Sequence, residues 1–569
     1  MTENASSHPV STAASTAAEL ADTVRIVPLG GLGEVGMNCL AIEQGGEVIL
    51  IDCGVTFDDR GLGVDVIHPL FDALEAYRGR IRGIFLTHGH EDHLGAVAHF
   101  LKRFDVPVWG PPYSLQLLHE RAHEHEILKY AQLVTVRPGE THKVGPFTIE
   151  PIRVTHSTAD ATALAIQTAA GMVIHTGDFK FDETPPDGEL FDVERLRTLG
   201  DQGVRLLMSD STNIDVPGPS GSEEGVRSAL HRLIAEAPGR VVVGLFASNV
   251  HRLRILGEIA QATGRSIVPL GRSVTTHARV AERTGYLHWP SGLTVSPEQA
   301  AHMPANRVLG IATGTQAEAN AALGRLSRGE HPLSLEVGDH VVLSSRVIPG
   351  HEPEVGALES TFLRRGIKVT NRAIDPGVHV SGHASRQEQR RMIELVRPRS
   401  FIPLHGTRHH LVRHAELAAS LGIADPLVLE NGDVGVLDAT ALRREGRWTT
   451  GRVHLGFGKP VSGDTLKERS TLAAEGIVFA AVPVSHGNVA GHIQLASRGV
   501  LAEPELADVL VMAALEAERA AAEHSTRLNE DAMKEAVRLA VRRVVARVVG
   551  YKTQVLVTLV PVAAPAEAQ

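Results

Sequence analysis

The sequence H-x-H-x-D-H, formed by His88, His90, Asp92 and His93, constrains this chain more than any other feature. Imidazole nitrogen and carboxylate oxygen are the ligands that suit a borderline cation such as zinc. The two leading histidines end a predicted strand and point the same way from it. The aspartate and the last histidine open an apolar-periodic helix predicted over residues 94–104 and approach from the other side. One turn can therefore supply two adjacent metal ions. A surface loop in a chain with 30 histidines is the weaker interpretation.

A metal centre of this kind requires further ligands downstream, and the sequence supplies them at the ends of later strands. Three apolar runs typical of buried strands each lead into a polar residue with small neighbours. Singly, each polar residue is more simply a helix cap or a satisfied core group. Together with the first cluster they predict one shared site. The runs are residues 147–154, 171–176 and 402–404, and the polar residues are His156, Asp178 and His405.

Length and composition bound the setting of this site. A chain of 569 residues exceeds the size of a single core, and its 43% hydrophobic and 21% charged residues are typical of globular proteins. The net charge of -10 argues against a dominant basic surface, so a nucleic acid would have to be held in local clefts. With only Cys39 and Cys53, the fold does not depend on disulfides, which favours a reducing cytoplasm. Residues 1–21 predict a disordered tail, and no segment is apolar enough to cross a membrane.

The glycine-rich segment 31–36 matches the dinucleotide fingerprint G-x-G-x-x-G, with Asp52 near the position of the ribose-binding acid. That fingerprint requires a helix after the glycines. Here two strands predicted over residues 39–43 and 47–51 follow as a hairpin, so we interpret the glycines as a tight turn.

The chain resembles the metallo-β-lactamase superfamily and, within it, the β-CASP nucleases of the ribonuclease J family. The resemblance runs from about residue 24 to about residue 433, with a weaker match beyond. In it, Asp52 corresponds to the aspartate that braces the metal loop. The motifs that single out this branch are S-D-S-T-N at 209–213, F-A-S-N-V-H-R at 246–252, T-G-T-Q at 313–316, I-P-G at 348–350 and H-V-S-G-H-A-S at 379–385.

The resemblance implies two zinc ions per subunit, with Mn²⁺ or Mg²⁺ as alternatives, and a water or hydroxide between them as nucleophile. It assigns His88, His90 and His156 to one ion, Asp92, His93 and His405 to the other, and Asp178 as a bridge. The implied catalytic residues are Asp92, Asp210 and His383, of which His383 would protonate the leaving oxygen or steady the scissile phosphate. The implied substrate-binding residues are Phe246, Ser248, Asn249, His379, Ser381, Gly382, His383 and Ala384.

Simpler interpretations and departures from the family pattern apply to residues outside the ligand set. Taken singly, the aspartate at 210 would be a helix cap and the phenylalanine at 246 a core residue.

Thr407 stands where the family leads us to expect Glu, and His351 where it leads us to expect Asn. Ala317 and Ala319 stand where Gly and Pro are expected. These departures put substrate contacts and the balance of cutting modes in question, but they remove no expected ligand.

The predicted fold class is α/β: an αββα metallo-β-lactamase sandwich with an inserted α/β β-CASP domain and a small C-terminal α/β domain. The insertion follows from the late return of His405. In the insert we expect a helix over 222–237 and a strand over 241–246. In the last domain we expect strands over 477–482 and 554–560 and a helix from about 529 to 549. Its Arg538, Arg542, Arg543 and Arg547 are better explained as a solvated face than as RNA contacts. The expected divisions are 1–21 (tail), 22–220 (metallo-β-lactamase domain, first part), 221–350 (β-CASP domain), 351–451 (metallo-β-lactamase domain, second part) and 452–569 (linker and C-terminal domain).

The function that the resemblance implies is hydrolysis of RNA phosphodiester bonds by two metal ions in RNA processing and decay. The substrate would be single-stranded, 5′-monophosphorylated RNA, cut by 5′-to-3′ exonuclease and endonuclease activities, with a terminal phosphate pocket near Ser381 and His383. We expect a cytoplasmic homodimer or homotetramer without a membrane partner. The alternatives left open are a β-CASP DNA-processing nuclease, a thioester or lactone hydrolase of the same fold, and a non-catalytic RNA-binding scaffold.

Overall fold

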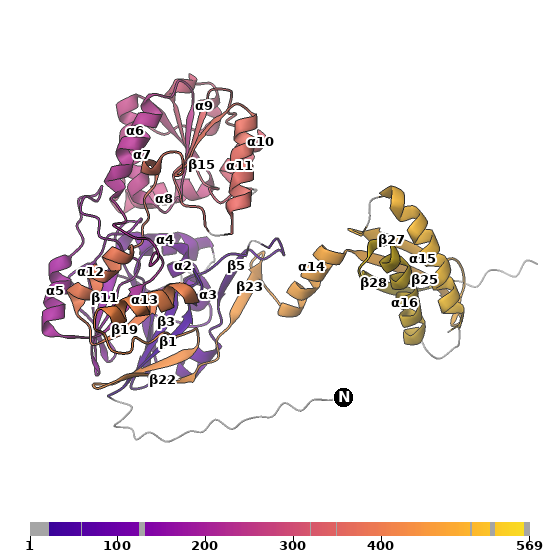
Figure 1. The fold of residues 1–569 in the computed structure, drawn as a ribbon, viewed down its shortest axis with the longest axis horizontal. Coiled ribbons are helices and arrows are strands. Elements are labelled where there is room, and N and C mark those ends of the chain that lie inside the picture. Colours follow the sequence, from indigo (N-terminus) through magenta and orange to yellow (C-terminus); the bar gives the residue numbers. More distant parts are fainter. Residues whose placement is uncertain are drawn as a thin grey trace, which may run out of the picture. The chain divides into compact units, whose positions relative to one another are not determined.

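The computed structural model describes residues 22–58, 60–124, 131–318, 320–348, 350–500, 503–523 and 530–562. The expected tail over residues 1–21 and the positions Ala319 and Pro349 lie outside the described residues. The described chain forms two compact units, and Figure 1 labels many of their elements. The first unit comprises the described residues up to 56 and 67–453, and the second comprises 57–66 and 454–562.

The core of the first unit consists of two β-sheets packed face to face. Apolar side chains from both sheets, such as Ile26, Ile42, Ile166 and Leu206, fill the space between them and are fully buried. In spatial order the larger sheet is β22 (Leu442–Arg447), β21 (Asp433–Leu437), β1 (Val24–Gly30), β3 (Cys39–Gln44), β4 (Glu47–Ile51), β6 (Ile81–Phe85), β7 (Val108–Gly110) and β8 (Leu133–Thr135). The smaller is β19 (Ser400–Leu404), β13 (Val204–Asp210), β12 (Gly171–His175), β11 (Thr162–Thr168), β10 (Phe147–Arg153) and β9 (His142–Val144).

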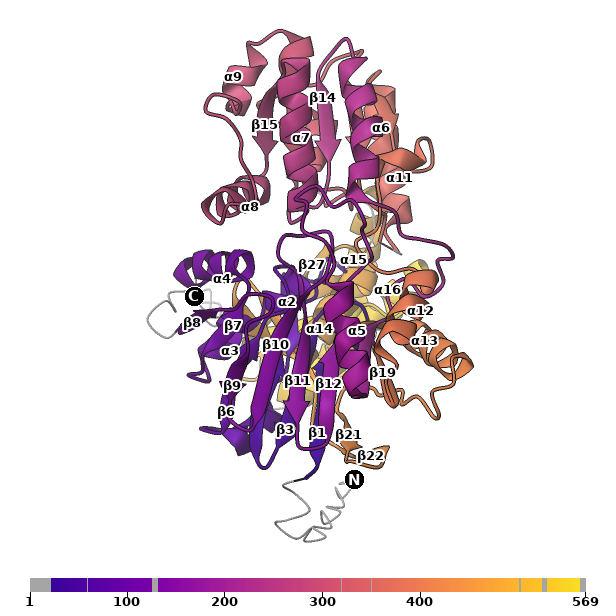
Figure 2. The same cartoon turned by 90° about the vertical axis from the view of Figure 1, so that its left-hand side faces the viewer.

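Helices cover the outer faces of both sheets and complete the sandwich. Leu196, Met392 and Ala418 bury the apolar stripes of three helices against the smaller sheet. Figure 2 shows α12 and α13 on one flank of the core and α3 and α4 on the other. The helices of the core are η1 (Asp72–Tyr77), α2 (Glu91–Leu94), α3 (Val97–Leu101), α4 (Pro112–Glu124), α5 (Val193–Gln202), α12 (Arg386–Val396) and α13 (Arg408–Ser420).

The inserted domain is built on a parallel five-stranded sheet. Its strands are almost wholly apolar because helices cover both faces, with α6 and α7 on one side and α10 and α11 on the other (Figure 1). The strand order is β15 (Ser266–Leu270), β16 (Val308–Ala312), β14 (Val241–Gly244), β17 (His340–Leu343) and β18 (Lys368–Thr370). The helices are α6 (Glu223–Ala235), α7 (Val250–Thr263), α8 (Arg272–Arg283), α9 (Pro297–Ala301), η3 (Ala305–Arg307), α10 (Ala322–Arg328) and α11 (Glu352–Arg364), and η4 (Pro376–Val378) follows on the return to the core.

Two expectations need correction. The expected boundary at residue 350 is wrong, because α11 packs on this sheet and β18 pairs with β17, with His340 opposite Lys368. The single helix expected over residues 94–104 is divided into α2 and α3. The N–H of Ala96 donates to the carbonyl of Cys53 at 2.9 Å instead of continuing a helical ladder, and this contact ties the helix to the loop that follows β4.

The glycine-rich segment is a turn, as expected. Gly31, Gly33 and Gly36 have φ of +88°, +82° and +92°, a conformation that glycine adopts without strain. The described residues between β1 and β3 contain the short strand β2 (Leu32–Gly33), which pairs with β20 (Gly406–Thr407), and no helix. The condition for a dinucleotide site is therefore not met.

The second unit contains a small sheet covered by two long helices. Val478, Ala480 and Val482 pack against apolar residues of α15 and α16. The predicted strands at 477 and 554 and the helix ending at 549 are confirmed. None of the helices in the described residues is both long enough and apolar enough to span a bilayer. The elements of the second unit are β24 (Lys459–Val461), α14 (Gly463–Glu475), β25 (Ile477–Ser485), β26 (Asn488–Val489), β27 (Gln494–Arg498), α15 (Glu503–Glu523), α16 (Glu530–Val549) and β28 (Gln554–Pro561). The strands β5 (Val66–Pro69) and β23 (Arg452–Gly456) each contain the residue at which the chain passes from one unit to the other.

Candidate metal centre

The seven expected ligands come together because they follow strands that end at one edge of the core. β10, β12, β13 and β19 run in the same direction, so their carboxyl ends meet. His156, Asp178 and His405 follow three of these strands. The loop after β6 carries His88 and His90, and α2 adds Asp92 and His93.

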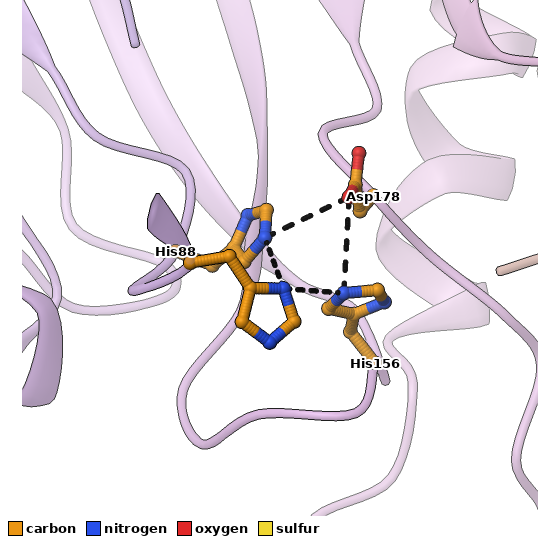
Figure 3. Close-up of side chains that lie close together, drawn as sticks. His88, His156 and Asp178 are labelled. Atoms are coloured by element: carbon orange, nitrogen blue, oxygen red, sulfur yellow. Dashed lines mark hydrogen bonds and ion pairs between the residues drawn. The ribbon is translucent and has the colours of Figure 1, made fainter. Parts of the chain in front are cut away.

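The first group of donor atoms contains His88, His90, His156 and Asp178. Figure 3 shows the side chains of His88, His156 and Asp178 directed toward one another. Nδ1 of His90 lies 3.1 Å from Nε2 of His88 and 3.1 Å from Nε2 of His156. Oδ2 of Asp178 lies 3.7 and 3.8 Å from the same two Nε2 atoms. A tetrahedral zinc site with metal–nitrogen bonds of about 2.0–2.1 Å has its donor atoms about 3.3 Å apart. The spacing and chemistry of these four donors therefore fit one metal ion.

A second group contains Asp92, His93, His405 and again Asp178. Nε2 of His93 lies 3.2 Å from Oδ2 of Asp178 and 3.6 Å from Oδ2 of Asp92. Nε2 of His405 lies 3.5 Å from Oδ2 of Asp92. This buried nitrogen has no hydrogen-bond partner, although buried polar atoms rarely lack one. A metal ion would satisfy it, and the second group therefore also fits an ion.

The electrostatics of the pocket agree with cation binding. Burial lowers the pKa of His88 and His156 well below the usual range and that of His90 to about 4, so these imidazoles are neutral and offer lone pairs. Burial also opposes a charge on His93, but Asp178, Asp92 and Asp52 outweigh it and raise the pKa of His93 well above its usual value. These three carboxylates therefore stabilise positive charge on this side of the pocket.

Neighbouring groups fix the orientation of the histidine rings. Oδ2 of Asp52 accepts from Nδ1 of His93 at 2.8 Å, and both carboxylate oxygens accept from Thr87, through its N–H and its hydroxyl, at 2.8 Å. On the other side, Nδ1 of His156 donates to the carbonyl of Gly382 at 2.7 Å. Each contact occupies Nδ1 and so directs Nε2 into the cluster. Asp52 thus takes the bracing place expected for it.

Asp210 and His383 form a third group with Asp178 and His405. Nδ1 of His383 lies 2.9 Å from Oδ2 of Asp210. The other carboxylate oxygen of Asp210 accepts from the N–H and the hydroxyl of Thr212 at 2.9 and 2.6 Å. Burial alone would lower the pKa of His383, but Asp210 and Asp178 outweigh it and raise that pKa to about 9. His383 therefore carries a proton at neutral pH in the metal-free pocket.

The expected substrate-binding residues divide between two places. Ser381 to Ala384 form a turn beside the cluster, where the hydroxyl of Ser381 accepts from Nδ2 of Asn213 at 2.8 Å and from the N–H of His383 at 3.2 Å. The exposed ring of Phe246 and the half-buried Ser248 lie beyond the carboxyl end of β14. Asn249 and His379 are buried instead in a polar network around Arg252.

Several contacts of the site were missed by the sequence reasoning. Nδ2 of Asn38 lies 3.1 Å from Nε2 of His93 and 3.4 Å from Oδ2 of Asp92. Arg346, from the inserted domain, donates to Oδ1 of Asn213 at 2.7 Å. Asn38 follows the glycine turn with no motif of its own. Asn213 is the last residue of the S-D-S-T-N motif, and its place in this motif is the feature of the sequence that indicates a role in the site.

Comparison with known proteins explains this order of elements. Family models match four stretches of the chain in sequence order. The matches are "Metallo-beta-lactamase superfamily" over residues 32–244, "Ribonuclease J, beta-CASP domain" over 238–360, "Zn-dependent metallo-hydrolase RNA specificity domain" over 366–425 and "Ribonuclease J C-terminal domain" over 464–562.

Similarity to individual proteins extends over most of the chain. A protein named ribonuclease J from Synechocystis sp. is 38% identical over 502 residues, which cover 87% of this chain and 78% of that protein. The ribonuclease J of Mycobacterium tuberculosis is 40% identical over 493 residues, which cover 85% of this chain and 87% of that protein. The chain belongs to the ribonuclease J family. It is accordingly a metal-dependent ribonuclease, and the predicted fold class is confirmed.

A solved structure shares the fold at low sequence similarity. A protein of unknown function from Enterococcus faecalis V583 has 16% identity and a TM-score of 0.50, covering 73% of this chain and 100% of that chain. Two of the positions expected to depart from the family pattern have clear local roles in the described residues. Thr407 caps α13, where its hydroxyl accepts from the N–H of His410 at 3.5 Å, and Ala317 adopts a φ of +65°.

Proposed function

We propose that this ribonuclease cleaves RNA phosphodiester bonds at a centre of two divalent metal ions, zinc in the first instance and Mn²⁺ or Mg²⁺ as alternatives. The observation that carries the proposal is the position of Asp178, whose Oδ2 lies 3.2–3.8 Å from nitrogens of both donor groups. His88, His90 and His156 would hold one ion, Asp92, His93 and His405 the other, with Asp178 shared. When bound, such a pair supplies a hydroxide near neutral pH and stabilises the charge of the in-line displacement.

The remaining residues position the RNA and move a proton. His383, held by Asp210, protonates the oxygen of the leaving nucleotide, and Asp210 keeps its ring oriented toward the cluster. The hydroxyl of Ser381 already accepts two hydrogen bonds, so its own proton is left to donate to a phosphate oxygen. Phe246 offers an exposed ring on which a base can stack.

We further propose that the substrate is single-stranded RNA with a 5′-monophosphate, that the Ser381–Ala384 turn receives this phosphate for 5′-to-3′ exonuclease cleavage, and that internal cleavage uses the same metal centre. The contacts of the turn with both His156 and Asn213 support this placement. We also propose a cytoplasmic homodimer or homotetramer.

The decisive experiment uses short single-stranded RNAs labelled at one end and carrying a 5′-monophosphate, triphosphate or hydroxyl. We expect metal-dependent release of nucleotides, fastest from the monophosphate, and its loss with a chelator. Metal analysis should give two ions per chain. His90→Ala should abolish cleavage while RNA binding persists. Full activity of this variant in metal-defined buffer would refute the metal assignment, and faster cleavage of a matched DNA would refute the substrate.

A further inference from the structure

Two segments connect the core to the inserted domain, one leaving after β13 and one returning after β18. Arg252, in the first turn of α7, lies at the base of the insert, where these two segments run. Its side chain is 1% exposed and is among the largest fully buried side chains of the described chain. The proposed chemistry makes no use of it. A buried guanidinium carries a large desolvation cost, so its position calls for an explanation.

Every part of this guanidinium is hydrogen-bonded. Nη2 donates to both carboxylate oxygens of Glu223 at 2.7 and 2.9 Å, and Nε donates to the same carboxylate at 3.2 Å. Nη1 donates to the carbonyl of Ser344 at 2.7 Å and lies 3.0 Å from both the Ser344 hydroxyl and Nδ1 of His379. Glu223 begins the insert, Ser344 follows β17, and His379 lies on the return segment. Arg252 thus joins the outgoing segment to the returning one.

Both ends of this network continue toward the metal centre. His379 lies two residues before Ser381, and the Ser344 hydroxyl donates to the carbonyl of Val378 at 2.6 Å. On the outgoing side, the N–H of Glu223 donates to Asp182 at 2.9 Å, and Asp182 pairs with Lys180 at 3.2 Å. Lys180 stands two residues after the shared candidate ligand. The network therefore reaches the strand end that carries this ligand and the turn that faces the substrate.

The charges of the network are matched, so it forms one fixed arrangement. Burial would raise the pKa of Glu223, but Arg252 and Lys180 outweigh it and lower that pKa to about 2. An apolar pair of similar volume would often be at least as stable in such a place. An apolar pair could not supply a planar guanidinium, which binds Glu223, Ser344 and His379 at defined angles.

We propose that Arg252 is a positioning residue. By joining Glu223 to His379, Arg252 holds the Ser381–Ala384 turn in the place where this turn receives RNA. The inference rests on the proposed function, because it concerns how that turn is placed against the metal centre. It predicts that removal of the network harms the cleavage of RNA far more than hydrolysis by the metal centre as such.

Bis(p-nitrophenyl) phosphate separates these two effects. Its leaving group departs without protonation and it has no RNA chain to align, so it reports on the metal centre and needs neither the turn nor His383 as an acid. The readout is the ratio of kcat/KM for 5′-monophosphorylated single-stranded RNA to kcat/KM for this small diester, measured on the full chain at saturating metal. Urea unfolding monitors the stability of each variant.

The test variant is Glu223→Gln/Arg252→Met, which removes both buried charges together, and Arg252→Met alone accompanies it. The control is Arg240→Met. Arg240 is also buried, and its Nη1 lies 3.3 Å from Oδ2 of Asp339. Arg240 and Asp339 lie just before the amino ends of β14 and β17. Arg252 and Ser344 lie beyond the carboxyl ends of these two strands. The control therefore disturbs a comparable pair in the same domain without touching the return segment.

We expect the ratio to fall at least tenfold in the double variant, because a misplacement of about 1 Å can cost about 100-fold in rate. The control should keep the wild-type ratio, whatever its loss of stability. A wild-type ratio in both Arg252 variants would overturn the inference, as would an equal fall in the control. Loss of the two activities in parallel would also overturn it. A wild-type chain inactive on both substrates would instead refute the proposed function.

Discussion

Replacing Asp52 by asparagine tests how the metal loop is held. Asp52 accepts from Nδ1 of His93, from the N–H of Thr87 and from the Thr87 hydroxyl, each at 2.8 Å. Its φ of +59° lies in the left-handed region, which asparagine adopts at least as readily as aspartate. The substitution therefore changes the hydrogen bonding while leaving the backbone unstrained.

An asparagine cannot reproduce all three contacts. If its oxygen accepts from the N–H of Thr87, its NH₂ group faces Nδ1 of His93. The imidazole must then carry its proton on Nε2, which is the atom directed into the cluster. If the amide is turned the other way, the N–H of Thr87 faces a donor and loses its acceptor. Loss of such an orienting contact typically lowers metal affinity or activity 10- to 100-fold, about 1.4–2.7 kcal/mol.

The assay is titration of the metal-free protein with Zn²⁺ or Mn²⁺ against a competing chelator, with RNA cleavage measured at saturating metal. We expect weaker binding at the group that contains His93, with partial recovery of activity at high metal concentration. Asp433→Asn is a matched control, because Asp433 is also a buried carboxylate of the core and accepts a backbone N–H at 3.0 Å. Wild-type affinity for two ions in Asp52→Asn would refute the reasoning.

Three further predictions concern buried residues of the first unit. Gly382→Ala places a methyl group 2.4 Å from the Ser157 hydroxyl, so the turn must shift, and RNA cleavage should fall about 100-fold in a single-turnover assay. Tyr113→Phe removes the 2.6 Å contact between the Tyr113 hydroxyl and Nδ1 of His277, both buried, and should lower the urea unfolding free energy by about 1–3 kcal/mol. Burial raises the pKa of Asp160 to about 7, above its unfolded value of about 4, so the folded state holds this proton more tightly. Stability from this group therefore declines as the pH rises from about 4 to about 7, and Asp160→Asn should flatten that part of the stability profile; an unchanged profile would contradict the shift.

The sequence predicted which candidate ligands the structure brings together, because they lie at or just beyond the ends of strands with a clear apolar pattern. The order of strands and ligands also required an insertion before His405. The network of Arg252 was beyond prediction, because its partners lie far apart along the chain and none belongs to a recognisable metal or catalytic motif. Asn249 and His379 show the limit from the other side. Their motifs suggested contacts with RNA, whereas their side chains serve the buried network.

The two structural corrections have local causes that periodicity does not record. The apolar pattern after His93 continues through residue 104, yet the Ala96 N–H is taken by a carbonyl from another loop and the helix divides. The late return of His405 required an insertion, but it did not fix where the insertion ends, and residue 350 was placed too early. The chain instead adds α11 and one more parallel strand before it returns, because β17 offers an edge to β18.

The discontinuous core has a consequence for how the chain folds during its synthesis. β1 pairs on one side with β3, close in sequence, and on the other with β21, where Val24 lies opposite Leu437. At about 5–20 residues per second, ribosomes make these two strands roughly 20–80 s apart. All five strands of the inserted sheet are synthesised within this interval. The insert can therefore be complete while one side of β1 still has no partner, and the last donor, His405, arrives at a core whose cap already exists.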